Sequence, residues 1–388
     1  MARAVGRAQA RPTALLVAGQ APIRSAEMQP TETAVHLPRL LCGPATEATL
    51  APVSYDFQAR VGRPNVPEED GCTPCIVVLS RTADREVDEL SLRLAIDGIP
   101  VLRLDSDRVE DLDVCWDVER DALVTVEGSF RPRACWLRYF DPTAIPAAAD
   151  ARLASYTRDQ WLYWAPALLA ARGGHAVNAA AGPGRPDRIG QLAHARSVGL
   201  HTPATVVTTS LAAAARRIPG EGDLLVKSLG AHFVEPAPGL LTGLAPRRVG
   251  RREAMSDDAL EPAPVVVQEF LPCERELRVY AVGGQLLTFA VHRPSPEALW
   301  TQPDRLRAHI VQTPHELTRP LRALVSRWAL DVAAFDLLDT PDGLVFLEVN
   351  AACDWLWCES LAGAAPVSAA VRKLLSALFV GRQGSNTR

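Results

Sequence analysis

The sequence contains almost no lysine: Lys227 and Lys373 are the only two, beside 39 arginines. This ratio is typical of genome-wide codon bias, so a lysine that persists against it is a candidate for a required chemical role. The formal net charge is −4 and no block of basic residues occurs. A nucleic-acid binder needs a basic patch or stripe, so we expect small or mixed-charge partners and no nucleic acid.

Long apolar runs and a disulfide framework are also missing. No run approaches the roughly 18 apolar residues of a membrane span, and the apolar stretch at 14–18 is shorter than the about 7–15 residues of a secretory signal. We therefore expect a cytoplasmic protein without a membrane segment. The eight cysteines lack regular spacing, which is typical of reduced thiols. Cys72 and Cys75 form a C-x-x-C pair, but a strand follows where a redox motif would open a helix.

The chain divides into an extension and two α/β domains. Residues 1–73 lack sustained periodicity, and we interpret them as a disordered or irregular extension. Residues 74–175 begin with a βαβ unit: a strand at Cys75–Ser80, a helix capped by Asp84, and a strand at Ile99–Asp105. No G-x-G-x-x-G motif accompanies this unit, which argues against dinucleotide binding. The rest of this domain is predicted to hold strands and a long helix, at 114–118, 122–127, 134–139 and 151–171.

The second domain, residues 176–388, alternates helices with strands. Its first helix, in "PDRIGQLAHARSVGL", is predicted to bury Ile189, Leu192 and Ala193 and to stop at Gly199. Apolar runs then predict strands at 204–208, 223–229, 264–271 and 275–291. A helix at 318–332, two strands around a turn at 339–343, and a final helix complete the domain.

The last two strands carry a group of hard oxygen donors. Around a turn at Pro341 and Gly343, alternation places Asp336 opposite Glu348, with Asn350 on the same face. The apolar residues of both strands take the other face: Phe335, Leu337, Leu347 and Val349. Without a balancing lysine or arginine, such carboxylates repel one another unless a cation lies between them, and Mg²⁺ bridging nucleotide phosphates is suitable. The alternative is a solvated polar face of an antiparallel hairpin.

Two cations and one strand end suggest a nucleotide site. Lys227 ends the strand core "LLVK", where its ammonium can reach phosphate oxygens, although a surface lysine is the alternative. Arg278 on a later strand can neutralise a phosphate, or else form a salt bridge to Glu276 or Glu274. The backbone at Glu269–Leu271 can pair with an adenine edge.

These motifs, in this order and spacing, resemble the ATP-grasp fold over residues 176–380. The segment 74–175 resembles the pre-ATP-grasp domain that precedes it. Four stretches narrow the resemblance to the ribosomal-peptide maturases, the microviridin or graspetide ligases: "QLAHARSVGLHTPATVVT", "LLTGLAPRRV", "ERELRVYAVGGQLLTFAV" and "FLEVNAACDWLWCE". Such an L-E-V-N segment followed by W-L-W is the hallmark of that family.

The resemblance implies a ligase that uses ATP and two Mg²⁺ ions to phosphorylate Asp or Glu side chains of a precursor peptide with a leader and a core. Ser, Thr or Lys side chains then close ω-ester or ω-amide rings. Homodimers are common in this fold. By position, Asp336, Glu348 and Asn350 would hold metal, and Arg278 and Lys227 would be catalytic. The remaining nucleotide contacts would come from Arg188, Gln268, Glu269, Phe270, Leu271 and Glu276, together with Lys227.

The chain departs from the family pattern at three places. Arg188 stands where many relatives carry a first phosphate-binding lysine, and the segment after Lys227 holds a single glycine in place of a Gly-rich flap. The residues 351–354 replace the usual P-N-G-Q. Two other functions therefore stay open: a RimK-like or glutathione-synthetase-like amino-acid ligase, and a non-catalytic binding protein. Trp355 and Trp357 are expected either in the core or at a substrate mouth.

Overall fold

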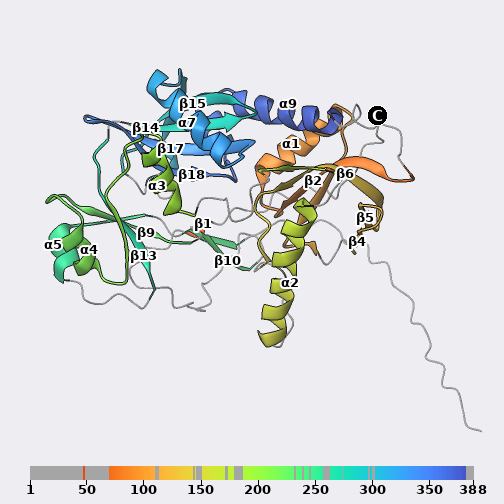
Figure 1. Cartoon of the computed structure of the whole chain (residues 1–388), viewed down its shortest axis with the longest axis horizontal. Coiled ribbons are helices and arrows are strands. Elements are labelled where there is room, and N and C mark those ends of the chain that lie inside the picture. The colour runs from red at the N-terminus through yellow and green to blue at the C-terminus, as the bar shows by residue number, and fades with distance from the viewer. Residues whose placement is uncertain are drawn as a thin grey trace, which may run out of the picture. The chain divides into compact units, whose positions relative to one another are not determined.

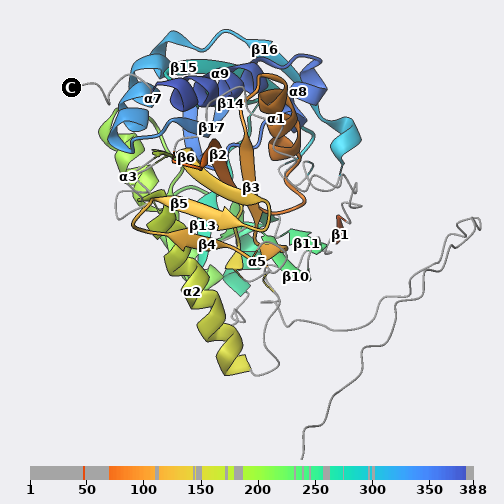
Figure 2. The same ribbon diagram turned by 90° about the vertical axis from the view of Figure 1, so that its right-hand side faces the viewer.

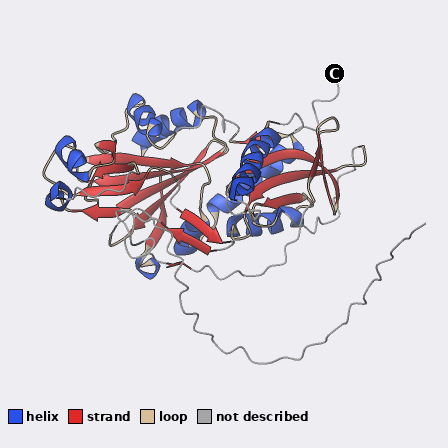
Figure 3. Cartoon of the chain, turned by 90° about the horizontal axis from the view of Figure 1, so that it is seen from below, coloured by secondary structure: helices blue, strands red, loops and turns tan. Residues whose placement is uncertain are grey.

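The computed structural model contains β-sheets with helices packed on their faces (Figure 3). The residues it describes are 47–48, 70–109, 113–142, 145, 151–170, 174–178, 187–230, 233–237, 240–243, 246–256, 263–273, 275–295, 298 and 302–381. Most of the predicted extension lies outside them, but Glu47–Ala48 form strand β1, which pairs antiparallel with β11 (Leu240–Gly243). No helix in the described part is both long and apolar enough to span a membrane.

The first large sheet has the strand order β3-β2-β6-β5-β4, with β7 beside β6. Its strands are β2 (Thr73–Ser80), β3 (Val101–Asp105), β4 (Cys115–Asp117), β5 (Ala122–Thr125), β6 (Gly128–Leu137) and β7 (His175–Val177). Strands β2 and β3 are parallel and are connected by α1 (Arg85–Ile96), which confirms the predicted βαβ unit. The Asp84 carboxylate accepts a hydrogen bond from the Val87 backbone N–H at 3.2 Å and caps this helix, as predicted.

Helices cover both faces of this sheet, because neighbouring strand residues point to opposite sides. Val78 packs with Leu90 of α1, whereas Val77 packs with Leu168 of α2 (Ala151–Leu169). Figure 2 shows α1 above and α2 below the strands of this sheet. The long helix predicted at 151–171 is thereby confirmed.

The second sheet is antiparallel, in the order β12-β9-β13-β8, and places Lys227. Its strands are β8 (Thr205–Thr208), β9 (Leu224–Ser228), β12 (Arg247–Val249) and β13 (Val265–Glu269). Helices α4 (Leu211–Arg217) and α5 (Arg251–Ser256) pack against Val226 and Val267 on one face (Figure 1). Lys227 and Gln268 therefore belong to the opposite face. After β9 the chain forms an antiparallel hairpin of β10 (Phe233–Ala237) and β11.

The third sheet is antiparallel in the order β16-β15-β14-β17-β18. Its strands are β14 (Arg275–Val282), β15 (Gln285–His292), β16 (Arg307–Val311), β17 (Val332–Thr340) and β18 (Gly343–Asn350), and the 3-10 turn η3 (Pro303–Arg305) precedes β16. One face packs on α3 (Gly190–Ser197) and α7 (His315–Arg327), and the other on α8 (Leu356–Ala362) and α9 (Pro366–Val380). Strands β17 and β18 pair antiparallel, which confirms the hairpin predicted around Pro341 and Gly343.

Helix α9 lies in a core shared by the first and third sheets. Its Val371 and Leu375 belong to the same buried cluster as Trp136 of β6 and Tyr280 of β14. Trp355 is 1% exposed and stacks on Trp136 with ring centroids 6.3 Å apart and planes 1° from parallel. Its burial excludes Trp355 from the substrate-mouth alternative and makes it a core residue.

Two helices differ from their predicted form. Helix α7 ends at Arg327 rather than at residue 332, because Ala329 adopts a left-handed φ of 46° and Val332 already begins β17. In α3, Ala193 is exposed, and the buried residues are Gln191, Leu192 and Ala195. The predicted burial of Ala193 was wrong because a polar residue, Gln191, takes an inward position.

A β-bulge in β18 sets the face on which each side chain lies. Asp336 pairs with Glu348, as predicted, but Leu337 pairs with Phe346, so Leu347 is the extra residue. By strict alternation Phe346 and Glu348 would share one face. The bulge instead places Phe346 in the core beside Phe335, with ring centroids 6.4 Å apart. The prediction that Leu347 lies in the apolar face was therefore wrong, since Phe346 takes that place.

Candidate functional site

The predicted oxygen donors lie together on one face of the third sheet, but an arginine accompanies them. Arg278, Asp336 and Glu348 are register partners on β14, β17 and β18. The Arg278 Nη1 donates to both Asp336 oxygens, at 2.7 and 2.9 Å. The expectation that no lysine or arginine balances these carboxylates was wrong, because antiparallel pairing of β14 with β17 brings Arg278 opposite Asp336. The predicted alternative, a salt bridge from Arg278 to Glu276 or Glu274, is wrong for Glu276, which pairs with Arg293 instead, and Glu274 lies outside the described residues.

Asn350 joins the two carboxylates. Its amide nitrogen lies 2.9 Å from Asp336 Oδ2 and 3.4 Å from Glu348 Oε1. The three side chains thus lie close enough to share one small ion. Burial raises the pKa of Asp336; Arg278 opposes this shift, and the charge of Glu348 adds to it.

This donor set fits Mg²⁺, which prefers oxygen ligands such as carboxylates and amide carbonyls. Two carboxylates whose charges disfavour each other gain from a divalent cation between them. Asn350 would have to turn its amide so that Oδ1 rather than Nδ2 faces the ion, and the two orientations differ by a simple flip. Among the described residues, no cluster of three or more His, Cys, Asp or Glu side chains offers a different metal site.

Lys227 is buried and belongs to the same group of charges, so the surface-lysine alternative is wrong. Burial lowers the pKa of Lys227; the charge of Glu348 opposes this shift, whereas that of Arg188 reinforces it. The Arg188 Nη1 donates to the Ser228 backbone carbonyl at 2.7 Å, next to Lys227 on β9. Charges from the second sheet and from the third sheet therefore meet here.

Glu276 and Arg293 complete the charged cluster. They form an ion pair two residues from Arg278 along β14, at the end of β15. Burial raises the pKa of Glu276, against the effect of Arg293, and the nearby charge of Asp336 adds to the rise. Cations and carboxylates thus alternate across the cluster, an arrangement that can hold phosphate oxygens and a metal ion side by side.

The predicted adenine segment, Glu269–Leu271, lies at the end of β13 and follows Gln268, which is on the same sheet face as Lys227. The buried Gln268 donates to Thr205 Oγ1 at 3.0 Å, and its Oε1 has no hydrogen-bond partner. The Glu269 carboxylate accepts from the Ala204 backbone N–H at 2.7 Å, so that side chain supports the strand. The Phe270 backbone N–H donates to the Asp223 carbonyl at 2.9 Å. Nucleotide contacts at these residues and at Leu271 stay predictions.

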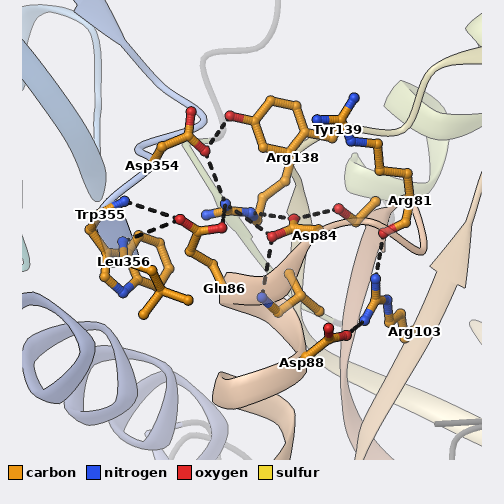
Figure 4. A network of polar contacts seen from close by, with 12 residues as sticks. Arg81, Asp84, Glu86, Asp88, Arg103, Arg138, Tyr139, Asp354, Trp355 and Leu356 are labelled. Carbon is orange, nitrogen blue, oxygen red and sulfur yellow. Dashed lines mark hydrogen bonds and ion pairs between the residues drawn. The ribbon is translucent and has the colours of Figure 1, made fainter. Parts of the chain in front are cut away.

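Two supports of the site were missed at the sequence level. Gln191 of α3 accepts a hydrogen bond from the Val349 backbone N–H at 2.7 Å and so fixes β18 between Glu348 and Asn350. The turn after β18 is held by Tyr139, which follows β6, and by Glu86 of α1, as Figure 4 shows. A polar residue at an otherwise apolar helix position was the signal for Gln191. No local signal marks contacts between segments so far apart in the chain.

No protein-family model matches this chain, and no curated protein matches it. Solved structures match. The macrocyclase MdnC of Microcystis aeruginosa MRC, bound with precursor peptide MdnA, has a TM-score of 0.64 and 19% identity over 78% of this chain and 99% of that one. A RiPP-associated ATP-grasp ligase of Chryseobacterium gregarium, in complex with ADP and a leader and core peptide, has a TM-score of 0.63 and 20% identity, covering 78% and 96%.

The D-cycloserine synthetase DcsG also matches, with a TM-score of 0.51 and 15% identity over 79% of this chain and 99% of that one. Nearly the full length of each of these proteins is therefore covered. The chain has the fold of these ATP-grasp proteins, as its motifs predict. Where the family pattern has a Gly-rich flap after Lys227, this chain has the β10–β11 hairpin.

Proposed function

We propose that this chain is an ATP- and Mg²⁺-dependent ligase that closes rings between side chains of a ribosomal precursor peptide. One observation carries the proposal: Lys227 of the second sheet comes together with Asp336, Glu348 and Asn350 of the third within this fold. A ligase that activates a carboxylic acid with ATP requires oxygen ligands for a metal ion and, on facing elements, cations that bind the phosphates.

The chemistry begins at an Asp or Glu carboxylate of the peptide, which attacks the γ-phosphorus of ATP and releases ADP. Lys227 and Arg188 bind the phosphates, and Arg278 neutralises charge on the phosphoryl group during its transfer. Asp336, Glu348 and Asn350 would hold Mg²⁺, which would neutralise charge on the phosphate oxygens. A Ser or Thr hydroxyl, or a Lys amine, then attacks the acyl carbon, phosphate leaves, and an ester or amide remains.

Gln268 supports the choice of ATP as the nucleotide. Its partnerless Oε1 is a buried hydrogen-bond acceptor on the face that carries Lys227. A buried acceptor without a donor costs about 1–3 kcal/mol, which an amino group can recover. Adenine presents such a donor at its six-position, whereas guanine presents a carbonyl there.

A peptide substrate is favoured over a free amino acid by the neighbouring structures. MdnC and the Chryseobacterium ligase, both solved with peptides, match at TM-scores of 0.64 and 0.63, above the 0.51 of DcsG. The amino-acid ligase function is the second candidate, because DcsG shares the fold over a similar share of this chain. Ester and amide linkages are both compatible with the cluster.

The test is an incubation of the purified protein with ATP, Mg²⁺ and a short Thr/Ser- and Asp/Glu-rich peptide encoded beside its gene. Mass spectrometry should show the loss of one water per ring, together with ADP. Replacing ATP by a non-hydrolysable analogue should abolish the loss and serves as the control. An unchanged peptide mass with ADP released only on addition of free amino acids would favour the second candidate instead.

A further inference from the structure

The turn that follows the proposed metal ligand Asn350 touches Arg278 directly. The backbone carbonyl of Asp354 accepts hydrogen bonds from Arg278 Nη2 at 3.2 Å and from the Tyr280 hydroxyl at 2.8 Å. The Arg278 Nε donates in turn to Tyr280 at 3.1 Å. With Nη1 on Asp336, the whole guanidinium is oriented by acceptors on three sides. The position of the Asp354 carbonyl therefore helps to decide where Arg278 points.

Residues of α1 and of the segment after β6 hold this same turn from the other side (Figure 4). The Tyr139 hydroxyl donates to the Asp354 carboxylate. The Glu86 carboxylate, at the start of α1, accepts from the backbone N–H groups of Trp355 and Leu356 at 3.2 and 3.3 Å. Asp354, Trp355 and Leu356 are thus fixed by side chains from α1 and from the segment after β6.

Arg138 lies at the centre of that second set and is fully buried. Its guanidinium pairs with Asp84 at 2.8 Å and lies 3.8 Å from Glu86 and 3.7 Å from Asp354. It also lies over the indole ring of Trp355, with 4.9 Å between the guanidinium carbon and the ring centroid. A buried cation among carboxylates is costly to displace, since each group would lose its partner. Arg138 therefore gives this side of the turn a fixed anchor.

The backbone of the turn shows that it is held in place rather than relaxed. Cys353 adopts a φ of 60°, in the left-handed region that glycine favours. A non-glycine residue there costs roughly 1–3 kcal/mol and persists when its surroundings determine it from several sides. The contacts to Asp354 from Tyr139 on one side and Arg278 on the other supply that constraint.

We propose that Tyr139, Glu86 and Arg138 are positioning residues for the ligase reaction, because they fix the turn whose Asp354 carbonyl aims Arg278 at Asp336. This inference rests on the proposed function, in which Arg278 meets the transferred phosphoryl group. None of the three residues is assigned a contact with nucleotide or metal. Their effect passes through the backbone of the turn.

Tyr139→Phe is the first test, since it removes one hydroxyl and keeps the ring. We expect kcat to fall about 10-fold, the effect of one charge-assisted hydrogen bond, with the KM for ATP little changed. The matched control is Asp97→Asn, which removes the exposed ion pair between Asp97 of α1's end and Arg372 of α9 and leaves the turn untouched. Its kcat should equal that of the wild type.

A double-variant cycle separates positioning from general loss of stability. If Tyr139 acts through Arg278, then Tyr139→Phe should add little to the defect of Arg278→Lys, so that the two effects on kcat are non-additive. Additive effects, or a wild-type kcat in Tyr139→Phe, overturn the inference. Glu86→Gln keeps an acceptor oxygen for the two N–H groups and should retain activity, whereas Glu86→Ala should lose it. Equal activity of the two Glu86 variants also contradicts the inference.

A crystal structure of Tyr139→Phe separates failure of this inference from failure of the proposed function. We expect the Arg278 guanidinium to have shifted from Asp336, a result that does not depend on turnover. An unmoved Arg278 overturns the positioning role even when the enzyme processes a precursor. If Arg278 is displaced in the variant but the wild-type protein processes no precursor, the positioning role stands. Only the proposed function is then contradicted.

Discussion

Arg278 and Asp336 are joined through a single guanidinium nitrogen that donates to both carboxylate oxygens, at 2.7 and 2.9 Å. The pair follows from register, because the two residues lie opposite each other on β14 and β17. Arg278 thus holds one proposed metal ligand while its other nitrogens bind the turn at Asp354. The proposed phosphate-binding cation and a proposed metal ligand therefore form one hydrogen-bonded unit.

Replacing Arg278 by Lys should therefore harm the reaction although the charge is kept. A lysine ammonium cannot reach Asp336, Tyr280 and the Asp354 carbonyl together, because it lacks the planar fork of donors. We expect kcat to fall about 10- to 100-fold, with a smaller change in the KM for ATP. Steady-state measurement of ADP release checks this, and a variant with the wild-type kcat would contradict the role given to Arg278.

Glu86→Gln should stabilise the protein at high pH. Burial raises the pKa of Glu86 to about 7 from its usual 4.5; Arg138 opposes the rise, and Asp354 and Asp84 add to it. Between these values the folded state keeps a proton that the unfolded chain has released, so the free energy of unfolding falls as pH rises through that window. Glutamine stays neutral, and should gain up to about 3 kcal/mol over wild type above pH 7.

The same pair of proteins at pH 4 supplies the control for this prediction, since Glu86 is then protonated in both the folded and unfolded states. Thermal melts should show a difference in Tm that is small at pH 4 and grows toward pH 8. A difference that is constant with pH would mean that the pKa of Glu86 is the same in the folded and unfolded states, and would contradict the prediction.

Asn178 should be required for stability, because its side chain joins three backbone segments. Its Oδ1 accepts from the N–H groups of Asp331 and Val332 at 2.8 and 3.0 Å, and its Nδ2 donates to the carbonyls of Val332 and Ala351 at 2.8 and 3.1 Å. Asn178→Ala leaves these groups without partners, and we expect a loss of about 2–4 kcal/mol in denaturant unfolding.

Asn178→Gly is the matched comparison. Asn178 has a φ of 57°, which glycine adopts without strain and alanine does not. The order of stability should be wild type, then Asn178→Gly, then Asn178→Ala, with about 1 kcal/mol between the variants. If the two variants are equally stable, the backbone at Asn178 is not strained as described.

The C-terminal hairpin could be predicted from sequence because its signals are local. Pro341 and Gly343 mark the turn, and alternation places Asp336 and Glu348 on one face. The bulge at Leu347 could not be predicted, since it depends on how Phe346 packs beside Phe335 in the assembled core. Local patterns fix which residues pair and leave the exact register to tertiary packing.

The supports of the site lie beyond sequence patterns for a different reason. Tyr139 and Asp354 meet although 215 positions separate them, and no sequence pattern links Tyr139 to the segment 351–354. Arg278 was identified as a candidate phosphate-binding residue and Asp336 as a candidate metal ligand. Their pairing was not predicted, because the neighbour across an antiparallel sheet depends on strand order. Lys227 was identified through its rarity, and its burial follows from the position of β9 within its sheet.

Glu348→Gln tests the central claim, that oxygen donors on β18 bind a Mg²⁺ ion that also contacts the nucleotide phosphates. Glutamine keeps the size of the side chain and one oxygen but removes the charge, so the fold should survive, as far-ultraviolet circular dichroism can verify. With the cognate precursor, ATP and Mg²⁺, mass spectrometry should show water loss for the wild type and none for the variant. Water loss at the wild-type rate in Glu348→Gln would contradict the account.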